Sequence, residues 1–206
     1  MLTDLIPIIS TSLGVLSILY ALLERIYFRY PVLEIVPHKD EPTEEDRIRG
    51  YMWYHVKVRN KKPPRLFRRE IARACKVRVS FLDKNGREIV RQITAHWTNQ
   101  PEPRDAQGRF QASLIPMCQE RDIGFLEEPI DILIKFEGER AFYAADPWVV
   151  YRFPQKSKEW EELKVEVEEG IIRLTFEAIN LGRPIVKQLR FKIKGEGLDD
   201  VEIITN

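Results

Sequence analysis

The sequence predicts a mainly β protein, a β-sandwich preceded by one N-terminal transmembrane helix. Three observations lead to this fold class. The chain opens with a long apolar run that contains no charged residue, and the remainder alternates apolar and polar residues in many short segments. Turn signals rich in Gly, Pro, Asn and Asp separate these segments, which is typical of sandwiches and barrels.

The length and composition fit one domain with an appendage. The chain has 206 residues, of which 44% are hydrophobic, enough to fill a sizeable core. Its 33 basic and 32 acidic side chains nearly cancel, so the chain as a whole has no electrostatic preference for nucleic acid. We expect residues 1–30 to form the transmembrane helix and a juxtamembrane segment, and residues 31–206 to form the β-sandwich domain.

The apolar run spans Leu5 to Leu23, nineteen residues without a charge. As a helix it would be about 28 Å long, close to the hydrocarbon thickness of a bilayer. Pro7 lies near the start, where a helix tolerates its missing N–H. Aromatic residues interleaved with arginines follow the run, as is typical of a membrane–water interface. These residues are Tyr20, Arg25, Tyr27, Phe28, Arg29 and Tyr30.

Three interpretations of this run compete. A cleaved signal peptide would need a basic start and a small-residue cleavage site, and the sequence has neither. A helix buried against a partner protein is an alternative interpretation, because serine and threonine residues at 10–12 and 17 dilute the hydrophobicity of the run. A membrane anchor is favoured, which makes lipid the expected partner of residues 5–23. Basic residues follow the run but do not precede it, so the positive-inside rule places the domain in the cytoplasm.

The strands are expected where apolar and polar residues alternate. They are residues 32–36, 51–59, 76–82, 88–97, 113–118, 122–126, 130–136, 141–145, 148–153, 163–167, 171–179, 186–194 and 201–205. Asp83-Lys84-Asn85-Gly86 and Glu168-Glu169-Gly170 are expected to be hairpin turns. Residues 38–49 and 98–111 are predicted loops, and residues 155–162 a polar connector with one helical turn.

The chain from residue 54 onward resembles adhesion-type immunoglobulin-like domains of prokaryotic, archaeal-type envelope proteins. The resemblance rests on a strand that ends in Asn, a loop, an alternating strand, and a later apolar–Pro–polar step. These are residues 55–60 (HVKVRN), 74–79 (ACKVRV), 114–116 (LIP) and 121–123 (RDI). The family usually carries Gly soon after the Asn, whereas Lys61-Lys62-Pro63-Pro64 stands here in a longer loop. The resemblance implies an immunoglobulin-like sandwich used for support or binding, and it supplies no catalytic residue.

A basic loop is the strongest local feature of the predicted domain. It contains Arg59, Lys61, Lys62, Arg65, Arg68, Arg69 and Arg73. The simplest interpretation is a solvated loop, or one paired with the domain's own acids, and the acidic segment 159–169 is a natural counterpart. The functional alternatives are anionic lipid, at about 1 kcal/mol per basic residue near a membrane surface, another protein, and, less favoured, nucleic acid phosphates.

The two cysteines, Cys75 and Cys118, lie in apolar surroundings and are expected to be buried thiols. A disulfide stays open if the domain faces an oxidising compartment. The histidines His38, His55 and His96 have no metal-ligand spacing. His55 and His96 can lie on neighbouring strands, where we expect ordinary surface or edge histidines.

No catalytic, cofactor-binding or metal-ligating residue is predicted. The acids at 122–131 fit no calcium loop, and no nucleophile elbow is present. We therefore expect a membrane-anchored, non-enzymatic interaction module. The alternatives are a ligand-binding or enzymatic domain of unrecognised type, which a deep pocket with convergent polar groups would indicate, and a subunit of a larger assembly with the apolar helix buried in protein. The sequence does not indicate an oligomeric state.

Overall fold

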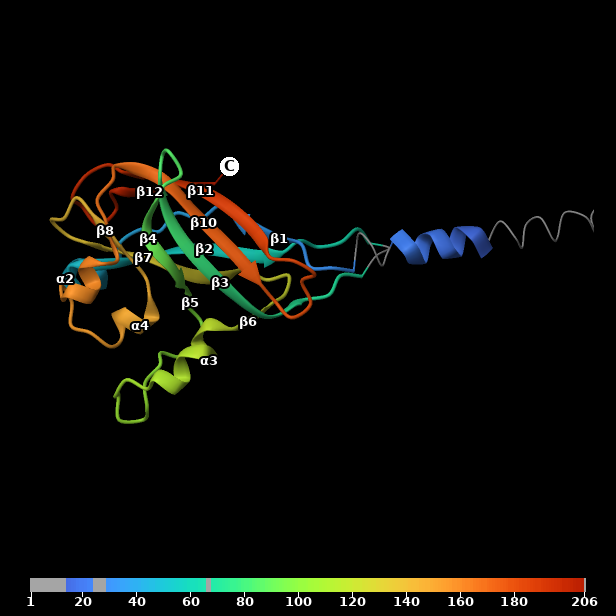
Figure 1. Cartoon of the computed structure of the whole chain (residues 1–206), viewed down its shortest axis with the longest axis horizontal. Helices are drawn as coiled ribbons and strands as arrows, with labels where there is room; N and C mark the ends of the chain where they lie inside the picture. Colours follow the sequence, from blue (N-terminus) through green and yellow to red (C-terminus); the bar gives the residue numbers. More distant parts are fainter. Residues whose placement is uncertain (1–13, 24–28, 66–67, 206) are drawn as a thin grey trace, which may run out of the picture.

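The computed structural model describes residues 14–23, 29–65 and 68–205, and it consists mainly of two antiparallel β-sheets (Figure 1). Sheet I contains β1 (Leu33–Val36), β2 (Tyr51–Asn60), β7 (Glu128–Phe136), β8 (Phe142–Ala144) and β9 (Lys164–Val165) in that order, and β5 (His96–Trp97) pairs with β7. Sheet II contains β12 (Val201–Thr205), β11 (Ile185–Ile193), β10 (Glu169–Glu177), β3 (Ala72–Asp83) and β4 (Glu88–Thr94), and β6 (Arg121–Ile123) pairs with β3.

The main core lies between the two sheets. Phe81 of β3 and Phe191 of β11 meet Phe142 of β8, with ring centroids 5.3 Å and 5.1 Å from the Phe142 ring. All three rings are fully buried. Burial of aromatic rings from both sheets is what holds a sandwich together. The predicted mainly β, two-sheet architecture is therefore confirmed.

The predicted strand over residues 88–97 is in fact two strands in different sheets. The chain leaves sheet II after Thr94 and enters sheet I at His96. Ala95, fully buried between them, donates its backbone N–H to the carbonyl of Val77, 2.8 Å away. The switch places His96 directly opposite Asp131 of β7.

A β-bulge lies between β2 and β7. Tyr54 pairs with Leu133, but the next residue, His55, pairs with Asp131, so Ile132 is the extra residue. Ile132 and Leu133 both pack into the main core. A bulge of this kind redirects the side chains that follow it. Ile132 and Leu133 both point inward, and the bulge then places the Asp131 side chain on the outer face of sheet I, beside His55.

A second apolar cluster covers part of that outer face. Its buried residues are Ile134, Phe136, Tyr143, Ala145 and Trp160. The short helices α4 (Pro147–Val150) and α5 (Lys158–Glu161) belong to this layer, and the Trp160 indole donates to the Phe153 carbonyl, 3.3 Å away. The helical turn predicted in the 155–162 connector is confirmed as α5.

Several expected elements differ in the structure. The predicted strand 148–153 is wrong, because the Asp146 carboxylate caps the Trp148 N–H and Pro147 begins α4. The predicted strand 113–118 is also wrong. It is a 3₁₀ turn (Ala112–Leu114) followed by α3 (Ile115–Gln119), which carries Pro in its first turn.

Two turn and loop predictions also need correction. The hairpin expected at Glu168–Gly170 is wrong, since β9 and β10 belong to different sheets, whereas the turn at residues 83–86 does join β3 to β4. The predicted loop 38–49 contains α2 (Glu44–Arg49), which begins at a capping box formed by Thr43 and Asp46 and ends at Gly50 with φ of 72°. The expected thiols are confirmed, since Cys75 and Cys118 are buried and free.

The expected transmembrane helix is described only in part. Residues 14–23 are helical and extend beyond the end of the sandwich at which β1 begins (Figure 1). Among the described residues, no helix has the length and apolar content needed to cross a membrane. The rest of the predicted segment, residues 5–13, lies outside the described part of the chain.

The packing of β10 between β3 and β11 gives a direct test of the fold. A Cβ added at Gly170 would lie 2.2 Å from the Leu82 carbonyl oxygen and 2.7 Å from the Phe191 ring. We expect Gly170→Ala to lower the free energy of unfolding by about 2–3 kcal/mol through overpacking. Gly182→Ala is the matched control, because nothing lies within 4 Å of its added Cβ, and its effect should stay within about 0.5 kcal/mol. Equal effects in urea unfolding would contradict this sheet order.

Candidate functional site

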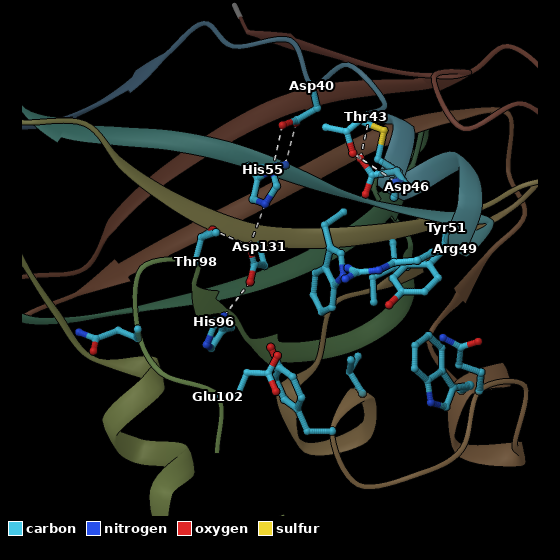
Figure 2. Close-up of a pocket in the computed structure, with 18 of the residues that line it drawn as sticks. Asp40, Thr43, Asp46, Arg49, Tyr51, His55, His96, Thr98, Glu102 and Asp131 are labelled. Atoms are coloured by element: carbon cyan, nitrogen blue, oxygen red, sulfur yellow. Dashed lines mark hydrogen bonds and ion pairs between the residues drawn. The ribbon is translucent and has the colours of Figure 1, made fainter. Parts of the chain in front are cut away.

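The outer face of sheet I carries a pocket of about 640 Å³ (Figure 2). Its walls come from β2, β5, β7, α2, the loop after β5 and the segment that follows α4. The volume lies within the range of small-molecule sites. The strand switch at Ala95 and the bulge at Ile132 are the two features that bring its central residues together.

A chain of hydrogen bonds crosses the floor of the pocket. The His55 ring lies between two carboxylates, with Nδ1 2.9 Å from Asp40 Oδ1 and Nε2 3.2 Å from Asp131 Oδ1. The other Asp131 oxygen lies 2.7 Å from His96 Nδ1, and the Thr98 hydroxyl donates to Asp131 Oδ1 at 2.5 Å. Figure 2 shows this Asp40–His55–Asp131–His96 chain, which we call the pocket relay. It joins three strands and the loop before α2, and the Thr98 hydroxyl adds the loop after β5.

The electrostatics of the pocket relay fix the charge of its two central groups. Burial alone would lower the pKa of His55, but hydrogen bonds and charge from Asp131 and Asp40 outweigh it and raise the pKa to about 9. Burial would raise the pKa of Asp131, yet the hydrogen bonds from His55, His96 and Thr98 lower it overall. At neutral pH the relay therefore contains a cationic His55 between two carboxylates.

His96 is the least satisfied member of the relay. Its side chain is 4% exposed, and its Nε2 is buried with no hydrogen-bond partner among the described residues. In the neutral ring the hydrogen belongs on Nδ1, because Nδ1 faces a carboxylate, and Nε2 then presents a lone pair. A buried polar atom without a partner costs free energy. A hydrogen bond from a ligand group or a water molecule to Nε2 would remove this cost.

Aromatic side chains form one wall of the pocket. The Tyr151 ring packs edge-on against His96, with centroids 5.8 Å apart, and lies nearly parallel to Trp53 at 6.5 Å. Arg104 lies 5.8 Å above the Tyr151 ring and is paired with Glu102 at 2.8 Å. Burial is the main cause that raises the pKa of the Tyr151 hydroxyl, so this hydroxyl stays protonated. The wall offers flat apolar faces beside polar groups that are already paired.

The sequence predicted these histidines as ordinary surface or edge residues. The structure instead places His55 and His96 on either side of Asp131, on strands that both pair with β7. One signal could have revealed the site, namely Asp131 standing inside the apolar run Ile130–Ile134. A carboxylate within a buried strand needs partners, and histidines in neighbouring strands are suitable ones. In the described part of the chain, no group of three or more His, Cys, Asp or Glu side chains is arranged to hold a metal ion.

The basic loop lies at the opposite end of sheet I from the pocket. Lys61, Lys62, Arg65, Arg68 and Arg73 are exposed, and Arg69 is half-buried and donates to the Lys61 carbonyl. Residues 66 and 67 lie outside the described residues. Arg59 is set apart from the others, because it pairs with Glu34 at 2.7 Å and lies 3.8 Å from Glu127.

The acidic segment 159–169 forms other pairs. Glu166 lies 2.9 Å from Lys164, and Glu168 lies 2.7 Å from Arg140. Arg59 of the basic loop instead pairs with Glu34 and Glu127, and Glu70, within the loop, pairs with Arg29 at 2.7 Å. The Arg29–Glu70 pair joins the loop to the chain that arrives from the N-terminal helix.

Exposed apolar side chains surround the basic loop at this end. Leu126 in the β6–β7 turn is 78% exposed, and Ile179 in the β10–β11 loop is 83% exposed. Both turns are tied to the loop region: Asn60 donates to the Gly124 carbonyl at 2.8 Å, and Ile179 donates to the Arg73 carbonyl at 3.0 Å. We call this surface the helix-proximal end. It combines basic side chains with apolar loop tips.

Comparison of the chain with protein-family models, with characterised proteins and with solved structures found no match.

The raised pKa of His55 predicts a pH dependence of stability. The pKa in the folded protein, about 9, lies above the ordinary value of 6.5, so the folded state holds this proton more tightly. The resulting stabilisation is complete below pH 6.5 and is lost as the pH rises through 9. We expect a loss of roughly 3 kcal/mol over this interval, measured by urea unfolding between pH 6 and pH 10.

The control for this experiment is His55→Asn, because the buried thiols also titrate at alkaline pH. Burial raises the pKa of Cys118 to about 11. The wild type and His55→Asn share the contribution of this thiol to the pH dependence of stability. The difference between the wild-type and His55→Asn profiles isolates His55. Parallel profiles would refute a cationic His55 in the relay.

Proposed function

We propose that the protein is a membrane-anchored, non-enzymatic interaction module, with one immunoglobulin-like sandwich held at the membrane by the helix within residues 5–23. The observation that carries the proposal is the exposure of the helical residues 14–23. Val15, Leu16, Ile18, Leu19, Leu22 and Leu23 are 46–64% exposed. At 100° per residue these positions cover about 160° of the helix circumference, and Gly14, Ser17, Tyr20 and Ala21 occupy the rest.

A helix whose large apolar side chains are exposed over so broad a face needs an apolar surrounding. Each such side chain gains about 1.5–3 kcal/mol from full burial, so leaving them in water is unfavourable. Lipid supplies that surrounding, and the uncharged run from Leu5 supplies the required length. The alternative, burial of the helix in a larger protein assembly, would satisfy the same side chains and is separated by experiment below.

The helix-proximal end supports contact with an anionic leaflet. Its basic loop would be attracted to anionic headgroups, at about 1 kcal/mol for each basic residue near the surface. Leu126 and Ile179, at the tips of adjacent turns, would enter the interface between headgroups and acyl chains. The positive-inside rule makes this the cytoplasmic leaflet and the sandwich a cytoplasmic domain. Nucleic acid is less favoured, because the basic residues gather where the anchor joins the domain.

Membrane fractionation tests the anchor. We expect the full chain to stay in the membrane pellet after 1 M salt and after alkaline carbonate, and to be released only by detergent. The double variant Leu16→Arg and Leu19→Arg should move to the soluble fraction, because two charges in the apolar run are costly in lipid. Val32→Arg, an exposed apolar residue outside the run, is the matched control. Release of the wild type by salt alone would contradict the proposed membrane anchor.

Limited proteolysis tests the leaflet contact. We expect trypsin to cut after Arg65 and Arg68 severalfold more slowly in phosphatidylserine nanodiscs than in phosphatidylcholine nanodiscs at low salt. High salt should remove the difference. Lys84, exposed in the β3–β4 turn at the other end of the sandwich, should be cut equally in both. Equal cleavage after Arg65 in the two lipids would contradict the contact.

A further inference from the structure

The pocket on the outer face of sheet I has features that the anchor does not explain. It opens at the end of the domain away from the helix-proximal end, since Tyr51 begins β2 there and Asn60 ends β2 beside the basic loop. Its floor holds a buried nitrogen, His96 Nε2, without a partner among the described residues. Its aromatic wall leaves Trp53 half-buried. These features do not depend on whether the helix spans a membrane.

We propose that this pocket binds a small neutral ligand with a hydroxylated ring, the chemistry of a saccharide or cyclic polyol. The ligand donates one hydroxyl to His96 Nε2 and packs a C–H face against the aromatic wall formed by Trp53 and Tyr151. Three separate features of the pocket lead to this class of ligand.

The first feature is the direction of the missing hydrogen bond. Asp131 accepts from His96 Nδ1, so the neutral ring offers a lone pair at Nε2. The missing group is therefore a donor. Because the atom is buried, that donor has to be held within the pocket. A hydroxyl serves well, since it donates here and still accepts from a second group.

The second feature is that the charged groups around the pocket already have partners. Asp40 and Asp131 hold His55, Glu102 holds Arg104, and Arg49 is paired with Glu45 outside the pocket. Of the other two lining carboxylates, Asp46 accepts hydrogen bonds from the Thr43 N–H and hydroxyl, and Glu41 lies 3.7 Å from Lys39. A charged ligand would have to break one of these pairs or lie beside an uncompensated charge, and both are costly. The pocket therefore favours a neutral ligand.

The third feature is the aromatic wall. The Trp53 and Tyr151 rings lie within 21° of parallel. Aromatic faces carry partial negative charge and attract the weakly positive C–H groups of a saturated ring. A hydroxylated saturated ring has C–H groups on its face and hydroxyl groups at its edge. Its face can pack on the aromatic wall while a hydroxyl at its edge bonds to the floor of the pocket.

Saturation-transfer NMR on the full chain tests the proposal. The protein is kept in a detergent without a sugar or choline headgroup. The probes are D-glucose, D-mannose, N-acetyl-D-glucosamine and myo-inositol, with choline as the cationic comparison and acetate, whose methyl protons are observable, as the anionic one. We expect saturation transfer to at least one of the four hydroxylated rings and none to choline or acetate.

Matched variants locate the binding. His96→Asn keeps an N–H opposite Asp131 but removes Nε2, and we expect it to weaken binding of the responding probe at least about tenfold. Trp53→Leu keeps an apolar side chain but removes the aromatic face, and should weaken binding likewise. Lys192→Asn alters an exposed residue of β11, in the other sheet, and should leave the affinity unchanged. The melting temperature of each variant confirms folding.

The outcomes decide the proposal. Binding that is lost in His96→Asn or Trp53→Leu and kept in Lys192→Asn supports it, and Trp53→Leu decides alone if His96→Asn does not fold. Transfer to none of the four rings, equal affinity in the pocket variants, or a response to choline or acetate instead would overturn it. The membrane fractionation result has no bearing on these outcomes.

Discussion

The outer face of sheet I is organised by one buried carboxylate. Asp131 is 5% exposed within the apolar run Ile130–Ile134, and a lone carboxylate there would be prohibitively unstable. Its neighbours supply three donors: His55 from β2, His96 from β5 and the Thr98 hydroxyl. The strand switch after Thr94 and the bulge at Ile132 are the two departures from a regular sandwich that make this possible. Both departures bring donors to Asp131 beneath the pocket.

The two ends of the domain have different chemistry. The helix-proximal end gathers basic residues and apolar tips where the chain arrives from the helix, with Arg29 held by Glu70. The pocket lies toward the other end, where Figure 1 shows α2 and α4. A module tethered at one end would present its pocket away from the tether. This arrangement fits a protein whose membrane contact and ligand contact are separate.

Much of the fold was predictable from local pattern, and the candidate site was not. Period-2 alternation identified β2 and β10 because each has one buried face. It failed at 113–118 and 148–153, where Pro116 and the Asp146 cap favour short helices. It also failed at 88–97, because alternation does not show that a strand changes sheets at Ala95. The relay was missed for the same reason: His55, His96 and Asp131 meet only through that switch and the bulge at Ile132.

The central claim is the charge and tautomer state of the pocket relay, and ¹⁵N chemical shifts of the histidine rings at pH 7.5 measure it directly. The account predicts a His55 ring protonated on both nitrogens, because it lies between Asp40 and Asp131. It predicts a hydrogen on Nδ1 of His96 and a lone pair on its Nε2. A neutral His55, or a His96 hydrogen found on Nε2 alone, would contradict it.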